Sequence, residues 1–240
     1  MDKSTVFITG ANSGVGLEVA RNFANAGYPV LAISRDIGKI QALGLPNTIC
    51  RSADVRDEYS IRKVVNEAEK LYGPVDFVFA NAGLAILGNP TNQKPSQWKE
   101  VIDTNILGVL NCVDCVLNNM VDRRSGTIAF MGSISGNRNY KDHAIYGASK
   151  AFLSSFAENL HNSVNQFGVR SMIINAGIIE TNFVDRVTDK RALQNYKTGK
   201  KWIGSGIEPK VIAQLLLKAY EMPNTVNLHE LTVLPTRQNL

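Results

Sequence analysis

Two side chains with complementary acid–base chemistry lie four residues apart in IYGASKAFLSSF, residues 145–156. Tyr146 carries a phenol and Lys150 an ammonium, and positions i and i+4 share one face of a helix. A tyrosine titrates near pH ~10, and a cation within about 4–6 Å favours the phenolate. Lys150 is therefore expected to move the pKa of Tyr146 toward neutrality, where general acid–base catalysis is most effective. About one such pair is expected by chance, so the rest of the chain has to support it.

A glycine-rich turn follows the first predicted strand and opens the first predicted helix. The stretch TGANSGVG spans residues 9–16. Gly10 allows a tight turn, Gly14 lets the backbone approach a pyrophosphate, and Gly16 lets the helix pack closely on the sheet. The N–H groups and the dipole at the start of the helix then face the phosphates. The order of strand, turn and helix therefore predicts a dinucleotide cofactor.

Short β-rich runs alternate with helical stretches along the chain. Strands are predicted over residues 5–9, 29–34, 48–52, 76–80, 126–132, 169–175 and 228–234. Helices are predicted over residues 15–27, 58–73, 95–124, 144–168 and 208–223. This alternation, with continuously apolar strands, is typical of a parallel sheet covered on both faces. We predict an α/β fold with a single Rossmann-type, doubly wound parallel sheet of about seven strands, helices on both faces, and one domain over residues 1–240.

The composition argues against several classes of protein. The net charge is +5, but the basic residues are scattered rather than gathered on one stripe, which argues against a nucleic-acid partner. No apolar run approaches the ~18 residues that span a bilayer, and the strand pattern begins too early for a signal peptide. Cys112 and Cys115 lie in a helical run, where apolar fillers are expected rather than metal ligands. We predict a cytoplasmic protein without a disulfide framework and without a metal site.

The turn has the spacing T-G-x-x-x-G-x-G, which resembles the short-chain dehydrogenase/reductase family. Further motifs match along nearly the whole chain: NAG at residues 81–83, Asp54 in SADV, Asn105 in DTNILG, and Ser133 thirteen residues before Tyr146. The resemblance implies an oxidoreductase whose catalytic residues are Asn105, Ser133, Tyr146 and Lys150. It implies a cofactor site formed by Gly10, Asn12, Ser13, Gly14, Val15, Gly16, Ser34, Arg35, Asp54, Val55, Asn81, Ala82, Gly83, Tyr146, Lys150, Gly177, Ile178 and Thr181.

The end of the second predicted strand indicates which dinucleotide binds. NAD enzymes of the family place an acidic residue there, whereas this chain has Ser34 and then Arg35. A guanidinium binds a 2′-phosphate bidentately, and no carboxylate repels it. NADP is therefore the predicted cofactor; the alternative is that Arg35 is a solvated charge that pairs with Asp36. Some NADP enzymes of the family carry a second basic residue where this chain has Ser13, so incomplete selectivity is expected.

The resemblance also implies a role for each catalytic residue. Lys150 bonds the nicotinamide ribose, and Ser133 holds the substrate oxygen. Asn105 positions a water in the proton path, and Tyr146 transfers the proton. In the loop NAGIIET after the sixth strand, Ala176 stands where the family usually has Pro, which leaves the unbound loop less fixed.

The tail TVNLHELTVLPTRQ, residues 225–238, resembles the NADP-dependent 3-hydroxy acid (serine 3-) dehydrogenase branch of the family. The resemblance implies oxidation of a 3-hydroxy acid, or the reverse reduction. A carboxylate substrate needs a cation or a donor, and the nearby candidates are Arg138, Lys141, His143 and Arg186. The polar, basic segment 181–206 is predicted to be a substrate lid.

Two alternatives stay open at this point. One is a general ketone or aldehyde reductase that ignores carboxylates, and the other is a non-catalytic NADP-binding sensor. In the family, the long helices expected over 95–124 and 144–168 pair between subunits, so the resemblance implies a homodimer or homotetramer. The expected partner is a small-molecule substrate, without nucleic acid or membrane.

Overall fold

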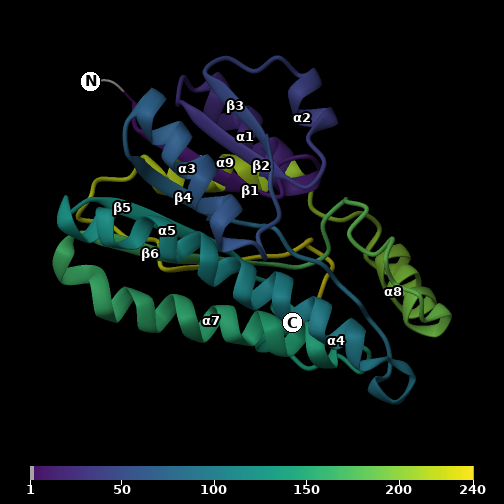
Figure 1. The fold of residues 1–240 in the computed structure, drawn as a ribbon. Helices are drawn as coiled ribbons and strands as arrows, with labels where there is room; N and C mark the ends of the chain where they lie inside the picture. Colours follow the sequence, from purple (N-terminus) through teal and green to yellow (C-terminus); the bar gives the residue numbers. More distant parts are fainter. Residues whose placement is uncertain (1–2, 240) are drawn as a thin grey trace.

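Seven strands form one sheet in the computed structural model, which describes residues 3–239 (Figure 1). Met1, Asp2 and Leu240 of the predicted 1–240 domain lie outside the described residues. In spatial order the strands are β3 (Thr48–Ser52), β2 (Val30–Ser34), β1 (Thr5–Thr9), β4 (Val75–Ala80), β5 (Gly126–Met131), β6 (Val169–Ala176) and β7 (Glu230–Val233). Every neighbouring pair is parallel. This order confirms the predicted doubly wound sheet, with a switch point between β1 and β4, where ligands bind such sheets.

Helices cover both faces of this sheet (Figure 1). Their bounds are α1 (Gly14–Asn25), α2 (Gly38–Ala42), α3 (Glu58–Tyr72), α4 (Pro95–Ile102), α5 (Gly108–Asp122), α6 (Ile134–Asn137), α7 (Ala144–Val164), α8 (Lys190–Ile203) and α9 (Pro209–Tyr220). One buried core unites α3, α5 and α7 through residues such as Val64, Val113 and Leu153. A second core unites α1 and α9 through Phe23 and Leu216. All of β6 is buried, as a strand with both faces covered should be.

Three α-helices of the described chain, α2, α6 and α8, were not among those predicted, and α8 is the longest of them. The Asp189 carboxylate accepts hydrogen bonds from Arg191 N at 2.9 Å and Ala192 N at 3.0 Å, which caps its first turn. Ala192 and Ile203 are its buried residues. The predicted lid segment 181–206 therefore contains a regular helix. In the part of the chain that the structure describes, no helix is long and apolar enough to cross a bilayer.

The predicted helix over 95–124 is interrupted in its middle. A π-helical turn, η2 (Asp103–Leu107), separates α4 from α5. Such turns hold one extra residue and often occur at functional sites. Here the turn contains Asn105, whose side chain is buried.

Candidate active site

A cleft of about 1340 Å³ lies along the carboxyl ends of the strands. Most of the predicted site residues line it: Gly10, Ser13, Gly14, Val15, Ser34, Arg35, Asp54, Val55, Asn81, Ala82, Gly83, Ser133, Tyr146, Lys150, Gly177, Ile178 and Thr181. The structure thus brings together residues that lie far apart in the sequence, from Gly10 to Thr181. Three predicted residues do not line the cleft: Asn12, Gly16 and Asn105.

The glycine turn between β1 and α1 is shaped by close backbone approach. Gly10 and Gly14 have φ of +65° and +53°, a region that glycine adopts without strain. A Cβ on Gly16 would lie 2.7 Å from Asn81 Nδ2, so only glycine allows the helix this close to β4. The N-cap residue Ser13 makes no side-chain hydrogen bond to the helix, and the first turn contains no acidic residue. The helix start is therefore open to an anion.

Asn12 has a structural role behind this turn. Its Nδ2 donates to Asp36 Oδ2 at 3.1 Å, and its Oδ1 accepts from Ile40 N at 2.9 Å. These bonds tie the turn to α2 and leave the side chain outside the cleft. Two local polar groups bind the Asn12 amide, so a contact of this residue with the cofactor stays a prediction.

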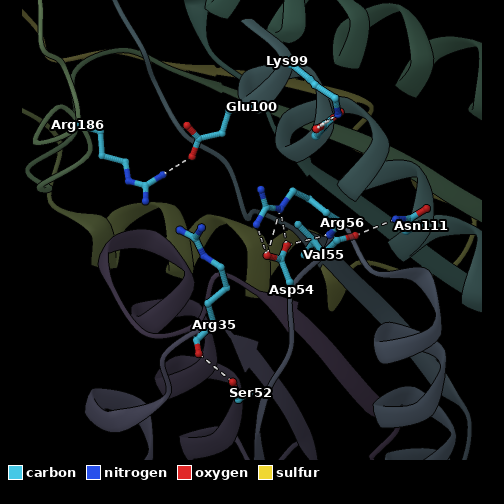
Figure 2. A network of polar contacts seen from close by, with 10 residues as sticks. Arg35, Ser52, Asp54, Val55, Arg56, Lys99, Glu100, Asn111 and Arg186 are labelled. Atoms are coloured by element: carbon cyan, nitrogen blue, oxygen red, sulfur yellow. Dashed lines mark hydrogen bonds and ion pairs between the residues drawn. The ribbon is translucent and has the colours of Figure 1, made fainter. Parts of the chain in front are cut away.

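Arg35 follows β2 and extends its guanidinium to the same side as the Asp54–Arg56 pair (Figure 2). Within residues 3–239, no carboxylate lies at ion-pair distance from Arg35. Asp36 instead accepts from Asn12 and from Gly38 N, so the alternative of an Arg35–Asp36 pair was wrong. Arg56 Nη2 lies 2.6 Å from Asp54 Oδ2, and this bond is the main cause of a lowered Asp54 pKa.

Tyr146 and Lys150 are both buried on α7, with side chains of 7% and 4% relative exposure. Lys150 Nζ lies 5.9 Å from the centroid of the Tyr146 ring and donates to Met131 O at 2.7 Å. Burial raises the pKa of Tyr146 to about 12, although the Ser133 hydroxyl opposes this shift. Burial also lowers the pKa of Lys150 to about 8.

The expected lowering of the Tyr146 pKa by Lys150 was therefore wrong for the protein alone. Removing the phenol from water disfavours the phenolate more than the neighbouring groups stabilise it. At neutral pH the Tyr146 hydroxyl is therefore protonated.

Asn105 connects the loop after β4 to α7. Its Oδ1 accepts from Leu84 N at 2.9 Å, and its Nδ2 donates to Leu84 O and to Ser149 Oγ, both at 3.0 Å. Ser149 Oγ in turn donates to Tyr146 O at 2.7 Å. We call these contacts the Asn105 clamp. It supports the backbone on which Gly83 and Tyr146 enter the cleft.

Apolar and polar side chains of the segment 181–206 both line the cleft near Tyr146. The Phe183 ring packs against Tyr146 at 5.7 Å between centroids. Asn195 Nδ2 on α8 donates to Asp142 Oδ2 at 2.9 Å, which joins α8 to the loop before α7. The apolar residues that contact one another here are Ala85, Leu87, Val187 and Ala192.

The four candidates for binding a carboxylate differ in their surroundings. Arg138 does not line the cleft, whereas Lys141, His143 and Arg186 do. Arg186 forms an ion pair with Glu100 at 2.8 Å (Figure 2). His143 Nδ1 lies 2.8 Å from Ser135 Oγ, and burial lowers its pKa.

The loop after β6 contacts a residue that sequence reasoning missed. Ile178 N donates to the Oε1 of Gln238 at 2.9 Å. Gln238 and Asn239 both line the cleft. No local pattern marks this contact, because the two partners lie far apart in the sequence.

Comparisons with known proteins give relatives that match nearly the whole chain. The chain is 32% identical to sulfoacetaldehyde reductase 2 of Chromohalobacter salexigens, covering 97% of this chain and 94% of that protein. It is 29% identical to an NADP-dependent 3-hydroxy acid dehydrogenase of Salmonella typhimurium, covering 98% and 96%. A closed form of serine dehydrogenase complexed with NADP+ superposes with a TM-score of 0.90 at 28% identity, covering 98% and 96%. Residues 4–192 match the short chain dehydrogenase family, and the chain belongs to that family.

Proposed function

We propose that this protein is an NADP-dependent oxidoreductase that moves a hydride between the nicotinamide and a secondary alcohol or its carbonyl, with a small 3-hydroxy acid as the alcohol. The observation that carries the proposal is that the buried Tyr146–Lys150 pair and the open glycine turn face one cleft. A proton donor and a dinucleotide site then serve the same substrate.

The residues present fit an NADP molecule. The start of α1 lacks a capping side chain and a first-turn carboxylate, which suits a pyrophosphate. Arg35 lines the cleft without an ion-pair partner among the described residues, which suits a 2′-phosphate. The Salmonella relative and the structurally similar serine dehydrogenase are both described with NADP. When bound, NADPH supplies the hydride.

The side chains then supply the proton and the orientation. The Tyr146 hydroxyl, which is protonated at neutral pH, donates a proton to the substrate oxygen in the reductive direction. The Ser133 hydroxyl shares that oxygen and holds it in place. Lys150 Nζ, fixed by Met131 O, presents its remaining N–H donors to the cofactor side of the cleft. The Asn105 clamp keeps the backbone of Tyr146 in position.

The names of similar proteins support a small anionic substrate. Serine and sulfoacetaldehyde carry a carboxylate and a sulfonate, and both names occur among the similar proteins. In this chain, Lys141 and His143 line the cleft, and the His143 ring lies 5.9 Å from the Tyr146 ring between centroids. His143 is held through Nδ1 by Ser135, which leaves Nε2 to face a ligand. We assign the acid group of the substrate to these two residues, since Arg186 already pairs with Glu100.

A general ketone or aldehyde reductase is the second candidate. It is favoured by an apolar part of the cleft lining, formed by Ala85, Leu87 and Ala192, which belong to one hydrophobic cluster with Tyr146. A neutral carbonyl compound would bury its apolar groups there without needing a cation.

A substrate panel with NADP(H) tests both candidates. L-serine, 3-hydroxybutyrate and neutral secondary alcohols are compared by NADPH absorbance, with the matching carbonyl compounds in reverse. Higher kcat/KM for the acids supports the proposal, and His143→Leu should then raise their KM without affecting neutral substrates. A kcat/KM for neutral substrates equal to that for the 3-hydroxy acids would reject a 3-hydroxy acid as the preferred substrate. Binding of NADPH without any turnover across the panel would instead indicate a sensor.

A further inference from the structure

The Gln238 side chain is hydrogen-bonded to a backbone N–H group, that of Ile178, inside the proposed cofactor site. Its side-chain Oε1 accepts from Ile178 N at 2.9 Å. The amide group packs directly over Gly177, because a Cβ added there would lie 2.9 Å from Gln238 Cδ. The segment that carries it is folded back, with Gln238 N donating to Pro235 O at 2.8 Å.

This donor lies at the reactive end of the cleft. β5 and β6 pair with Met131 opposite Ile174, so the residues that follow these two strands are neighbours. Ser133 follows β5, and Ile178 follows β6. Lys150 reaches the same edge, since its Nζ donates to Met131 O. A nicotinamide bound beside Tyr146 and Lys150 would therefore lie near the Ile178 N–H.

The chemistry of the two groups is the same. A glutamine side chain ends in a primary carboxamide, and the nicotinamide ring carries one as well. Each offers one carbonyl oxygen and an NH2 group. The Ile178 N–H is a single donor and already has a partner in Gln238. The nicotinamide carboxamide therefore cannot accept this hydrogen bond until the Gln238 carboxamide has moved away.

We propose that Gln238 competes with the nicotinamide carboxamide for the Ile178 N–H, so that NADP(H) binding has to displace this side chain. The inference rests on the proposed function. The segment around Gln238 also touches the lid, because the Arg237 guanidinium lies 5.9 Å from the centroid of the Trp202 ring. Displacement of Gln238 therefore disturbs a contact of α8.

The opposite role for Gln238 predicts the opposite sign. Ala176 stands in place of a rigid proline, and the Gln238 bond could instead hold the loop in its binding shape. In that case, removing Gln238 weakens cofactor binding. If Gln238 is a competitor, its removal strengthens binding.

Titration of NADPH fluorescence separates the two roles. Gln238→Ala should lower the Kd of NADPH about three- to tenfold, the range of one net hydrogen bond. Gln238→Glu keeps an oxygen that accepts the same N–H, so it should not lower the Kd. Asn239→Ala is the matched control, since Asn239 also lines the cleft. Adenosine diphosphoribose 2′-phosphate lacks the nicotinamide, and its Kd should not respond to Gln238→Ala.

Each other outcome has a separate meaning. An unchanged or raised Kd for NADPH in Gln238→Ala overturns the competition. An equal decrease in the Kd of adenosine diphosphoribose 2′-phosphate would also overturn the competition, because this ligand has no nicotinamide carboxamide. Failure of the unsubstituted protein to bind NADPH would contradict the proposed function itself. Thermal unfolding of each variant checks that the fold is retained.

Discussion

Asn105 Nδ2 and Ser149 Oγ form a buried hydrogen bond of 3.0 Å that joins the π-helical turn to the helix of Tyr146 and Lys150. Ser149 lies between those two residues in the sequence and donates onward to Tyr146 O. The proposed proton donor is thus connected to the loop after β4 through two side chains. Substitution of Asn105 should affect stability as well as catalysis.

Asn105→Ala should lower the free energy of unfolding by about 2–4 kcal/mol, because Leu84 and Ser149 lose their partner in a buried region. Urea denaturation measures this change. The control is Asn159→Ala, an exposed residue whose amide bonds Ser155 on the same helix; it should stay within about 0.5 kcal/mol. A loss of turnover in Asn105→Ala at full stability would show that Asn105 acts only on the reaction.

Tyr146→Phe should lower kcat by at least about a hundredfold, since it removes the proton donor but keeps the ring against Phe183. The Kd of NADPH should stay within about twofold. Steady-state kinetics and fluorescence titration measure the two quantities. Tyr196→Phe is the control, because it removes a phenol from the lid side of the same cleft and should retain turnover. Activity retained in Tyr146→Phe would place the acid elsewhere.

The affinity for NADPH should fall as the pH rises through about 8, the pKa of Lys150 in the protein alone. Only the protonated amine offers three N–H donors and a positive charge to the cofactor. The group is charged below this pKa and neutral above it, so the Kd is flat at lower pH and increases at higher pH. Titrations across this range measure the slope. Lys150→Met should remove the slope and weaken binding at low pH; an identical slope in the variant would assign it to another group.

Arg35→Ala should raise the Kd of NADP+ about 10- to 100-fold and leave that of NAD+ within about twofold, since only NADP+ has the 2′-phosphate. Calorimetric titration with both cofactors measures this difference. Arg51→Ala is the control, because Arg51 pairs with Glu67 and does not line the cleft. Equal weakening of both cofactors would reject the phosphate role of Arg35.

Local patterns were enough to predict the glycine turn, the strands of the sheet and the placement of Tyr146 and Lys150 on one helix, because each depends on near neighbours in the sequence. The sign of the Tyr146 pKa shift was not predictable this way, since it depends on burial by distant segments. The Gln238–Ile178 bond was missed for the same reason. For α8 a signal did exist: Asp189 is a good N-cap, and Ala192 follows it on the buried side. The polar composition of the segment obscured that signal.

The turn Asp103–Leu107 is equivalent to a one-residue insertion within an otherwise continuous rod formed by α4 and α5. Deletion of one residue from this turn would restore regular α-helical hydrogen bonding. The helices α4 and α5 on either side would still bury the same faces. The shortened chain would gain regular helical bonding and lose the π-helical turn that places Asn105 beside Leu84 and Ser149. A one-residue difference in length at this turn would therefore distinguish a chain that only folds from one that also supports the Tyr146 backbone through Asn105 and Ser149.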